Sequence, residues 1–215
     1  MVFFGQGEEK EEPEKEKLIP KRYYLSDDVV LLSKDLIGKV LVTSFDGERT
    51  AGLIVETEAY RAPDDKASHA YGNRKTKRNA VMFEEGGIAY VYLCYGIHHL
   101  FNIVTNSKDV PHAILIRALH PIEGIELMAK RRTKKLTDKR LCVGPGSVSQ
   151  AMGITTAQSG HPLIESPIWL EDPKIEVPDD LIKSGPRIGI DYAGEDAKLP
   201  WRFYLDPLAI SQLFT

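Results

Sequence analysis

The fold of this chain is decided by residues 39–60, KVLVTSFDGERTAGLIVETEAY. The first six residues and the last eleven are rich in the β-branched and aliphatic side chains that favour strands. Between them stands the pair Asp46-Gly47, which favours the tight turn of a β-hairpin because both residue types tolerate a positive φ. The segment therefore predicts two strands joined through a tight turn.

The chain before this hairpin has the pattern of a helix. Residues 25–39, LSDDVVLLSKDLIGK, place apolar side chains at positions 29, 32 and 36, which share one helical face. Ser26 is expected to cap the helix, the acids after it suit the positive end of the helix dipole, and Gly38 is expected to end it.

The chain after the hairpin predicts further strands and a second helix. Strands are predicted at residues 88–95, 99–105 and 112–119, separated by Gly96 and by an NSKD turn. Residues 121–132, PIEGIELMAKRR, predict a helix that begins at its proline and ends in bases. The last third reads as short strands between Gly and Pro turns, so the chain as a whole predicts an α+β fold. One side of the second helix is expected to carry the apolar residues Ile122, Ile125, Met128 and Ala129.

Length and composition predict one folded domain behind a charged tail. The chain has 215 residues, 42% of them hydrophobic and 27% charged, which fits a single core. Residues 1–17 hold six Glu and three Lys, so we expect them to form a disordered acidic tail, and residues 18–215 to form one domain. No apolar run approaches the roughly 20 residues of a membrane span, and the start lacks the order of a secretory signal. We therefore expect a soluble, intracellular protein that does not bind membranes.

The hairpin ends in two acids that point the same way. Side chains at i and i+2 of a strand share a face, so Glu56, Glu58 and Tyr60 are expected to lie together. Paired carboxylates are used for hydrolysis at a sugar carbon, where one can deprotonate water or stabilise a cationic transition state while the other protonates the leaving group. The alternative is a solvated strand face with ordinary ion pairs.

Two basic clusters indicate a polyanionic partner. Residues 72–79, GNRKTKRN, carry four bases and no acid, and residues 130–140, KRRTKKLTDKR, carry seven bases and one acid. Such clusters in a chain without excess positive charge are typical of nucleic-acid binding. For the second cluster, a helix end whose cations suit its dipole is the alternative.

The segment YVYLCYGIHH adds aromatic surface. It holds three tyrosines and the adjacent pair His98 and His99. Adjacent residues on a strand face opposite ways, so this pair is not expected to bind a metal, and Cys94 and Cys142 have no metal-ligand spacing. Rings for stacking, cations for phosphate and an acid for the sugar bond together indicate nucleobases as the substrate.

These residues carry a resemblance to a known family. The chain resembles the 3-methyladenine (alkyladenine) DNA glycosylase family over about residues 25 to 205. The segment after Arg132 is shorter than in vertebrate members, and Ile97 and His98 beside the turn differ from them. The matching features, in family order, are ETEAY (56–60), His69, RKTKRNAVMF (74–83), YVYLCYG (90–96), Asn102, ILIRALHPIEG (114–124), LCVGPG (141–146), RIGIDYAGE (187–195) and PWRFY (200–204).

The resemblance implies a role for each matched residue. Glu58 is implied as the general base, with Arg117 and the backbone carbonyl of Ile188 beside the attacking water, and the role of Glu56 is left open. Tyr95 is implied to fill the gap that a flipped base leaves in the duplex. The implied base pocket consists of Tyr60, His69 and Tyr92 around the base and Asn102 at the floor, opposed to the amino group of guanine. The expected phosphate contacts are Arg74, Lys75, Lys77, Arg78 and Arg132.

The resemblance also implies a fold and an activity. The fold is a single domain with a mixed, mostly antiparallel curved β-sheet, flanking helices and a protruding β-hairpin that inserts into DNA. The activity is base-excision repair, in which 3-methyladenine, 7-methylguanine, hypoxanthine or ethenoadenine is flipped from duplex DNA and its N-glycosidic bond is hydrolysed, leaving an abasic site. We expect no cofactor and no metal, because no nucleotide-binding or metal-ligand motif is present, and no lyase chemistry, because no lysine suits a Schiff base.

The expected protein is a monomer whose product passes to abasic-site repair enzymes, in the cytoplasm or nucleoid of a prokaryote or the nucleus of a eukaryote. Two other functions stay open at this point. A non-catalytic nucleic-acid-binding module would need the bases and tyrosines but not Glu58. A carbohydrate hydrolase would use Glu56 and Glu58 but would not need the basic clusters.

Overall fold

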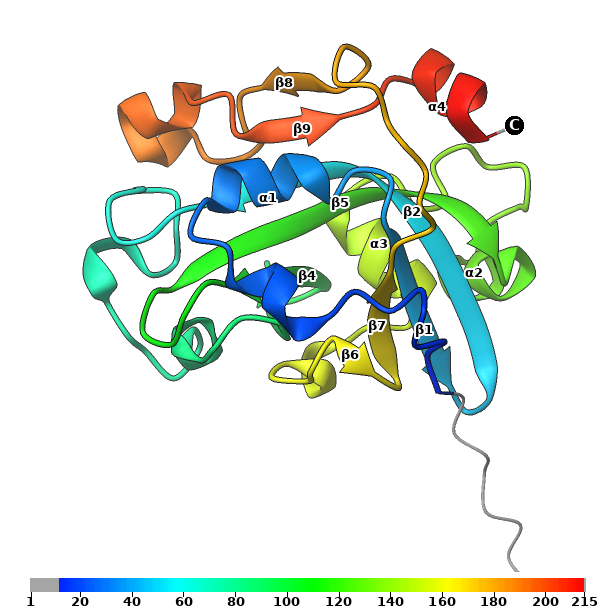
Figure 1. Cartoon of the computed structure of the whole chain (residues 1–215), viewed down its shortest axis with the longest axis horizontal. Coiled ribbons are helices and arrows are strands. Elements are labelled where there is room, and N and C mark those ends of the chain that lie inside the picture. The colour runs from blue at the N-terminus through cyan, green and yellow to red at the C-terminus, as the bar shows by residue number, and fades with distance from the viewer. Residues whose placement is uncertain (1–11, 215) are drawn as a thin grey trace, which may run out of the picture.

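The computed structural model describes residues 12–214, in which nine strands form one sheet (Figure 1). Along the main path the strand order is β3-β4-β5-β2-β1-β7-β6, and β9 adds to β2 and carries β8. The predicted α+β fold with a mostly antiparallel sheet is confirmed, and every strand pair in the described chain is antiparallel. The strands are β1 (Val40–Phe45), β2 (Glu48–Tyr60), β3 (Ile88–Cys94), β4 (His98–Thr105), β5 (His112–Glu123), β6 (Ile164–Glu165), β7 (Ile168–Glu171), β8 (Lys183–Gly185) and β9 (Arg202–Tyr204).

The predicted tail falls only partly on the described chain. Residues 1–11 lie outside the described residues. From Glu14 to Lys17 the chain makes a turn, in which the N–H of Lys17 donates to the carbonyl of Glu14 at 3.0 Å. The division into a tail and one domain stays a prediction.

The β1–β2 hairpin forms as its sequence predicts. Asp46 and Gly47 both have positive φ, at 55° and 75°, and the two strands pair from Phe45↔Glu48 onward. The long strand β2 pairs with β5 along one edge, and with β1 and then β9 along the other. Its pairing with β5 is interrupted by register shifts around Glu56, and such bulges bend a strand. β2 is therefore the strand that joins the two halves of the sheet.

The first helix, α1 (Val29–Asp35), forms with a different cap from the one predicted. The carboxylate of Asp28 accepts the N–H groups of Val30 and Leu31 at 3.0 and 2.9 Å, so Asp28 is the cap and Ser26 is not. The helix begins two residues later than a Ser26 cap would place it. Its predicted apolar face is confirmed, and the buried residues of that face are Val29, Leu32 and Leu36.

The second helix, α2 (Ile125–Arg132), begins later than predicted. Pro121 is the partner of Gly52 in the sheet, so the chain from Pro121 to Glu123 continues β5 and is not helical. Strand pairing with β2 therefore prevails over the helix-starting preference of proline. The helix starts after Gly124, whose φ is 66°, and Ile122 is exposed and does not share its buried side. Met128 and Ala129 are buried as predicted.

The C-terminal third contains more helix than predicted. The prediction of short strands holds for β8 and β9, but Asp191–Lys198 between them forms a 3-10 helix that is kinked at Gly194. Two α-helices, α3 (Pro145–Met152) and α4 (Pro207–Phe214), and a short 3-10 helix, Thr156–Gln158, were also not predicted. None of the described helices is long and apolar enough to cross a membrane.

The strand period divides the sheet into two faces. On β5, Ile114, Ile116 and Ala118 enter the main hydrophobic core, so Leu115 and Arg117 point to the other face. The core face is covered by α1, which crosses β2 and β5 (Figure 1). The helices α2 and α3 pack on each other, and α3 also packs on β4 and β5. This leaves part of the opposite face open for a site.

The packing of α1 makes a testable prediction from two adjacent leucines. Leu32 is 6% exposed and Leu31 is 62% exposed. Leu32→Ala should lower the free energy of unfolding by about 2–5 kcal/mol, because it leaves a cavity in the core. Leu31→Ala should change it by no more than about 0.5 kcal/mol. Urea unfolding of both variants measures the difference, and equal losses would mean that α1 does not pack as described.

Candidate active site

A cavity of about 780 Å³ lies on the open face of the sheet. It is lined by strand residues, by the start of α3 and by the segment from Ile188 to Ile190. Cross-strand neighbours in a sheet share a face, so the strand register decides which side chains meet here. The pairs Glu58↔Leu115, Leu115↔Asn102 and Asn102↔Tyr90 form one row across β2, β5, β4 and β3.

Glu58 is fully buried beneath the lining of this cavity. Its Oε1 accepts the backbone N–H of Ile188 at 2.7 Å. Its Oε2 accepts the hydroxyl of Tyr60 at 2.8 Å and Nη1 of Arg117 at 3.3 Å. Burial raises the pKa of the Glu58 carboxyl, against the opposing effects of Arg117, the Ile188 N–H and the Tyr60 hydroxyl. A carboxylate with a raised pKa is a stronger base, and three residues that line the cavity hold this one in place.

Glu56 lies beside Glu58 but is bound to two arginines. Its Oε1 accepts Nε of Arg117 at 3.2 Å and Nη1 of Arg202 at 3.0 Å. Arg117 therefore bridges the two carboxylates, and Arg202, from β9, completes a chain of alternating charges. Sequence reasoning left the role of Glu56 open and gave none to Arg202. Glu56 therefore holds Arg117 from one side while Glu58 binds it from the other.

The predicted pocket residues Tyr60, His69 and Tyr92 all line the cavity. The rings of His69 and Tyr92 are 4.6 Å apart between centroids, at 70° to each other. Nδ1 of His69 also lies 2.9 Å from the hydroxyl of Tyr90, which sequence reasoning noticed as aromatic surface but did not place in the site. Desolvation, with a smaller effect from the positive charge of Arg78, lowers the pKa of His69 to about 4. The imidazole is therefore neutral at pH 7.

Asn102 lies in the cavity wall with its side chain fixed. It is buried, and Nδ2 donates to the backbone carbonyls of Tyr90 at 3.1 Å and Leu100 at 3.3 Å. Such bonds hold an amide in one orientation. Its predicted position in the pocket agrees with this placement, and its predicted action on guanine stays a prediction.

Tyr95 stands at the tip of the β3–β4 hairpin, beside the cavity. Cys94 pairs with His98, so a three-residue turn holds Tyr95, and this ring is 90% exposed. Tyr95 has a positive φ of 51°, a conformation that a bulky residue rarely adopts. Ile97, at the other end of the turn, is 71% exposed. The hairpin predicted to enter DNA thus presents two apolar side chains to solvent, and its entry into DNA stays a prediction.

The predicted phosphate contacts divide into two groups. Arg74, Lys75 and Lys77 are exposed on the loop before β3. Arg78, from the same loop, lies 5.0 Å from the ring centroid of Tyr92 and lines the cavity. Arg132 instead donates to the carbonyl of Leu141 at 3.1 Å and to Oε1 of Gln150 at 2.8 Å.

The second basic cluster is in part structural. Like Arg132, the neighbouring Arg131 bonds within the chain and donates to the carbonyl of Ala151 at 3.1 Å. Both guanidinium groups tie α2 to α3, a role that neither the phosphate contact nor the helix-dipole alternative predicted. Contact of either cluster with phosphate stays a prediction.

The histidines of the β3–β4 hairpin separate as their spacing predicts. Nδ1 of His99 accepts the N–H of Thr156 at 3.2 Å, whereas His98 lines the cavity beside Gly146. Within residues 12–214 no group of three or more His, Cys, Asp or Glu side chains is placed to hold a metal ion.

Two parts of the site were missed by sequence reasoning. The start of α3, including Pro145 and Gly146, lines the cavity. A buried ion pair between Asp65 and Arg187 lies behind Tyr60. Pro145, Gly146 and Arg187 belong to motifs on which the resemblance is based, and Asp65 follows another. A motif does not show which of its residues are buried together in the fold.

Comparison with known proteins adds independent information. The family model described as "Methylpurine-DNA glycosylase" matches residues 23–207. A relative from Chlamydia abortus is 50% identical over 189 residues, covering 87% of this chain and 98% of its own length. One from Chlamydia pneumoniae is 47% identical, with 88% and 96% covered, and one from Bacillus cereus is 45% identical, with 86% and 94% covered. The names of all three provisionally assign them as 3-methyladenine DNA glycosylases.

The environment of His69 makes a prediction that NMR can test. In the wild type, the imidazole should titrate with a pKa of about 4, well below the ordinary value. Arg78→Gln should raise this pKa, because a neighbouring positive charge disfavours the imidazolium, but burial should keep it below the ordinary value. Lys77→Gln, in the same loop, should leave it unchanged. A wild-type imidazole that titrates near pH 6.5, or one that does not respond to Arg78→Gln, would contradict the described surroundings.

Proposed function

Because the chain belongs to the methylpurine-DNA glycosylase family, and is therefore a DNA glycosylase, we propose that it hydrolyses the N-glycosidic bond of damaged purines with a water activated by Glu58. One observation supports this most directly. Glu58 is a fully buried carboxylate beneath a cavity lined with aromatic rings, and its pKa is raised by burial. A general base of this kind is suited to deprotonate water near neutral pH.

The cavity fits a base that has left the duplex. Its volume of about 780 Å³ is within the range of small-molecule sites. A stacked base cannot reach such a cavity, so the enzyme has to flip the nucleotide, at a cost of roughly a few kcal/mol that is smallest for damaged or mispaired bases. Tyr95, exposed at the hairpin tip beside the cavity, supports a role in filling the gap that the flipped base leaves.

The aromatic rings of the cavity support an alkylated purine as the substrate. Alkylation at a ring nitrogen makes the base cationic, which improves it as a leaving group. The rings of Tyr60 and Tyr92 would attract such a cation by roughly 0.5 to 2 kcal/mol. His69 is neutral at pH 7, so its imidazole adds no like charge beside the base.

The proposed chemical step needs a water between Glu58 and the sugar. Glu58 takes a proton from this water as its oxygen attacks the sugar carbon, and the purine leaves with the bonding electrons. Arg117 lies within reach of the same carboxylate, and the carbonyl of Ile188 is proposed as a further contact to the water. The products are a free purine and an abasic site, which abasic-site repair enzymes would process.

The substrates proposed are 3-methyladenine, 7-methylguanine, hypoxanthine and ethenoadenine in duplex DNA, with Asn102 disfavouring guanine, and the enzyme is proposed to act as a monomer. The direct test is base release from duplexes that each carry one of these lesions, followed by cleavage at the abasic site. Binding without release would favour a non-catalytic nucleic-acid-binding module. Release from none of the four would overturn the proposal.

Replacing the proposed base tests the mechanism. Glu58→Gln should reduce the single-turnover rate of excision by about 100- to 10,000-fold, because general-base catalysis contributes that much. Lesion binding should be largely retained, since the amide has nearly the shape of the carboxylate. Glu56→Gln is the matched control and should be milder, because Glu56 acts through Arg117. If Glu56→Gln were the more damaging change, the assignment of the two acids would be reversed.

Tyr95 provides a separate test of base flipping. Tyr95→Ser should lower the fraction of flipped ethenoadenine, because stacking of a base on an aromatic side chain contributes about 1–3 kcal/mol. The loss of excision rate should be largest for a well-paired lesion and smallest for a mispaired one. Ethenoadenine fluorescence reports the flipped fraction directly. An equal loss of rate in both contexts would mean that Tyr95 only packs the turn.

A further inference from the structure

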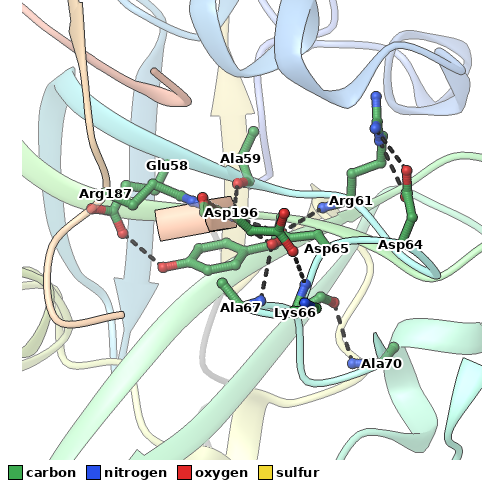
Figure 2. A network of polar contacts seen from close by, with 12 residues as sticks. Glu58, Ala59, Arg61, Asp64, Asp65, Lys66, Ala67, Ala70, Arg187 and Asp196 are labelled. Atoms are coloured by element: carbon green, nitrogen blue, oxygen red, sulfur yellow. Dashed lines mark hydrogen bonds and ion pairs between the residues drawn. The ribbon is translucent and has the colours of Figure 1, made fainter. Parts of the chain in front are cut away.

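Arg187 lies in a network of contacts behind the catalytic face of β2 (Figure 2). Nη1 donates to Asp65 Oδ2 at 2.6 Å and to the carbonyl of Ala59 at 2.8 Å. Nη2 donates to Asp65 Oδ1 at 2.8 Å and to the carbonyl of Asp196 at 3.1 Å. The side chains of Arg187 and Asp65 are both fully buried. The guanidinium thus joins the end of β2, the loop after it and the 3-10 helix before β9.

The same guanidinium lies against two rings. It is 4.8 Å from the ring centroid of Tyr60 and 5.1 Å from that of Trp201. Tyr60 is the residue whose hydroxyl donates to Glu58. The planar guanidinium of Arg187 restricts the position of this ring and therefore the direction of its hydroxyl.

Arg187 also acts on Glu58 through the backbone. The next residue, Ile188, donates its N–H to Glu58 Oε1 at 2.7 Å. The four hydrogen bonds of the Arg187 side chain fix the start of this segment, and therefore the position of that N–H. Arg187 can therefore affect the position of Glu58 in two ways, through the ring of Tyr60 and through the amide of Ile188. None of the contacts described for Arg187 is with Glu58 itself.

Asp65 accepts hydrogen bonds from two backbone N–H groups in addition to Arg187. Its Oδ1 also accepts the N–H of Ala67 at 2.9 Å, and its Oδ2 accepts that of Arg61 at 3.3 Å. Ala67 lines the cavity, so the same carboxylate fixes one wall of the site. Burying an ion pair rarely stabilises a protein more than apolar side chains of the same size would. The pair is therefore better explained by the geometry that it imposes than by stability alone.

We propose that Arg187, held by Asp65, is a positioning residue for the excision reaction, and that it orients Glu58 through the Ile188 amide and the Tyr60 ring. This inference rests on the proposed function. Lysine keeps the charge of Arg187 but lacks the planar guanidinium, whose two terminal nitrogens bind both oxygens of Asp65. Arg187→Lys should therefore displace Ile188 and Tyr60 without changing the local net charge.

The effect should be visible in the pH dependence of excision. The N–H of Ile188 favours the ionised form of Glu58, so weakening that bond raises the pKa of this carboxyl. Displacing the hydroxyl of Tyr60 acts in the same direction, because its bond to Glu58 also favours the ionised form. The other charged groups that face Glu58 are Arg117 and Glu56, with Arg202 beyond Glu56, and Arg187→Lys leaves their charges unchanged. The acidic limb of the pH–rate profile should therefore move to higher pH.

The experiment measures single-turnover excision of hypoxanthine across that limb, normalised to the folded fraction. Arg187→Lys should lower the rate by about 10- to 100-fold, as small misplacements of reacting groups do, and should shift the limb upward. Asp65→Glu also conserves charge and should shift it in the same direction. This variant decides the question if Arg187→Lys does not fold.

The matched control is Arg49→Lys. Arg49 also lies over a tryptophan, 5.4 Å from the ring centroid of Trp169, and pairs with Glu171 at 3.2 Å, but it sits at the other end of β2, away from the cavity. This variant should keep the wild-type excision rate and the wild-type position of the acidic limb of the pH–rate profile. A rate that follows only the folded fraction in Arg187→Lys, with the limb unmoved, would make the pair purely structural and overturn the inference. A wild type that releases no purine would instead overturn the proposed function on which the inference rests.

Discussion

The requirement to bury the carboxylate of Glu58 determines how the rest of the site is built. An ionised carboxylate without water has to be surrounded by hydrogen-bond donors, because an unpaired buried charge is very costly. Its donors come from three separate parts of the chain: Tyr60 on β2 itself, Arg117 on β5, and the amide of Ile188 in the segment between β8 and the 3-10 helix. The charged state of this one side chain therefore depends on the assembly of the whole sheet. The same donors limit how far burial can raise its pKa.

The two acids of β2 share a face because they stand two residues apart on a strand, and arginines separate their charges. Arg117 lies between the carboxylates, and Arg202 binds Glu56 from the far side, so that negative and positive groups alternate from β9 across β2 to β5. Spacing alone did not distinguish the two acids, since both stand at equivalent positions of one strand. Their surroundings do, because Glu58 is fully buried beneath the cavity lining, whereas Glu56 is held between two cations. The two basic clusters also differ in their surroundings, since Arg131 and Arg132 bind carbonyl groups of their own fold while Arg74, Lys75 and Lys77 are exposed.

The glycosylase family, shared with bacterial relatives over most of the chain, agrees with the chemistry that these contacts support. The proposed flipping of a base requires a rigid centre and an exposed element beside it. The rigid centre here lies on the sheet, where the row from Glu58 to Tyr90 spans four paired strands. The exposed element is the three-residue turn between β3 and β4 with Tyr95 at its tip. Because β3 and β4 carry both one end of this row and the turn, their pairing fixes the distance between the row and Tyr95.

The sequence by itself determined the local features: the β1–β2 hairpin with its Asp46-Gly47 turn, the shared face of Glu56, Glu58 and Tyr60, and the apolar side of α1. These follow from residue spacing and turn preferences, which act over a few residues. Even local rules failed where two elements competed, since pairing of Pro121 with Gly52 extended β5 and delayed α2. Only the tertiary structure decided the strand register that aligns Glu58 with Asn102, the bond from Ile188 to Glu58, and the pair of Asp65 with Arg187. The residues of each of these contacts lie far apart in the chain, and no local preference specifies them, because they form only when the whole sheet has paired and its core has packed.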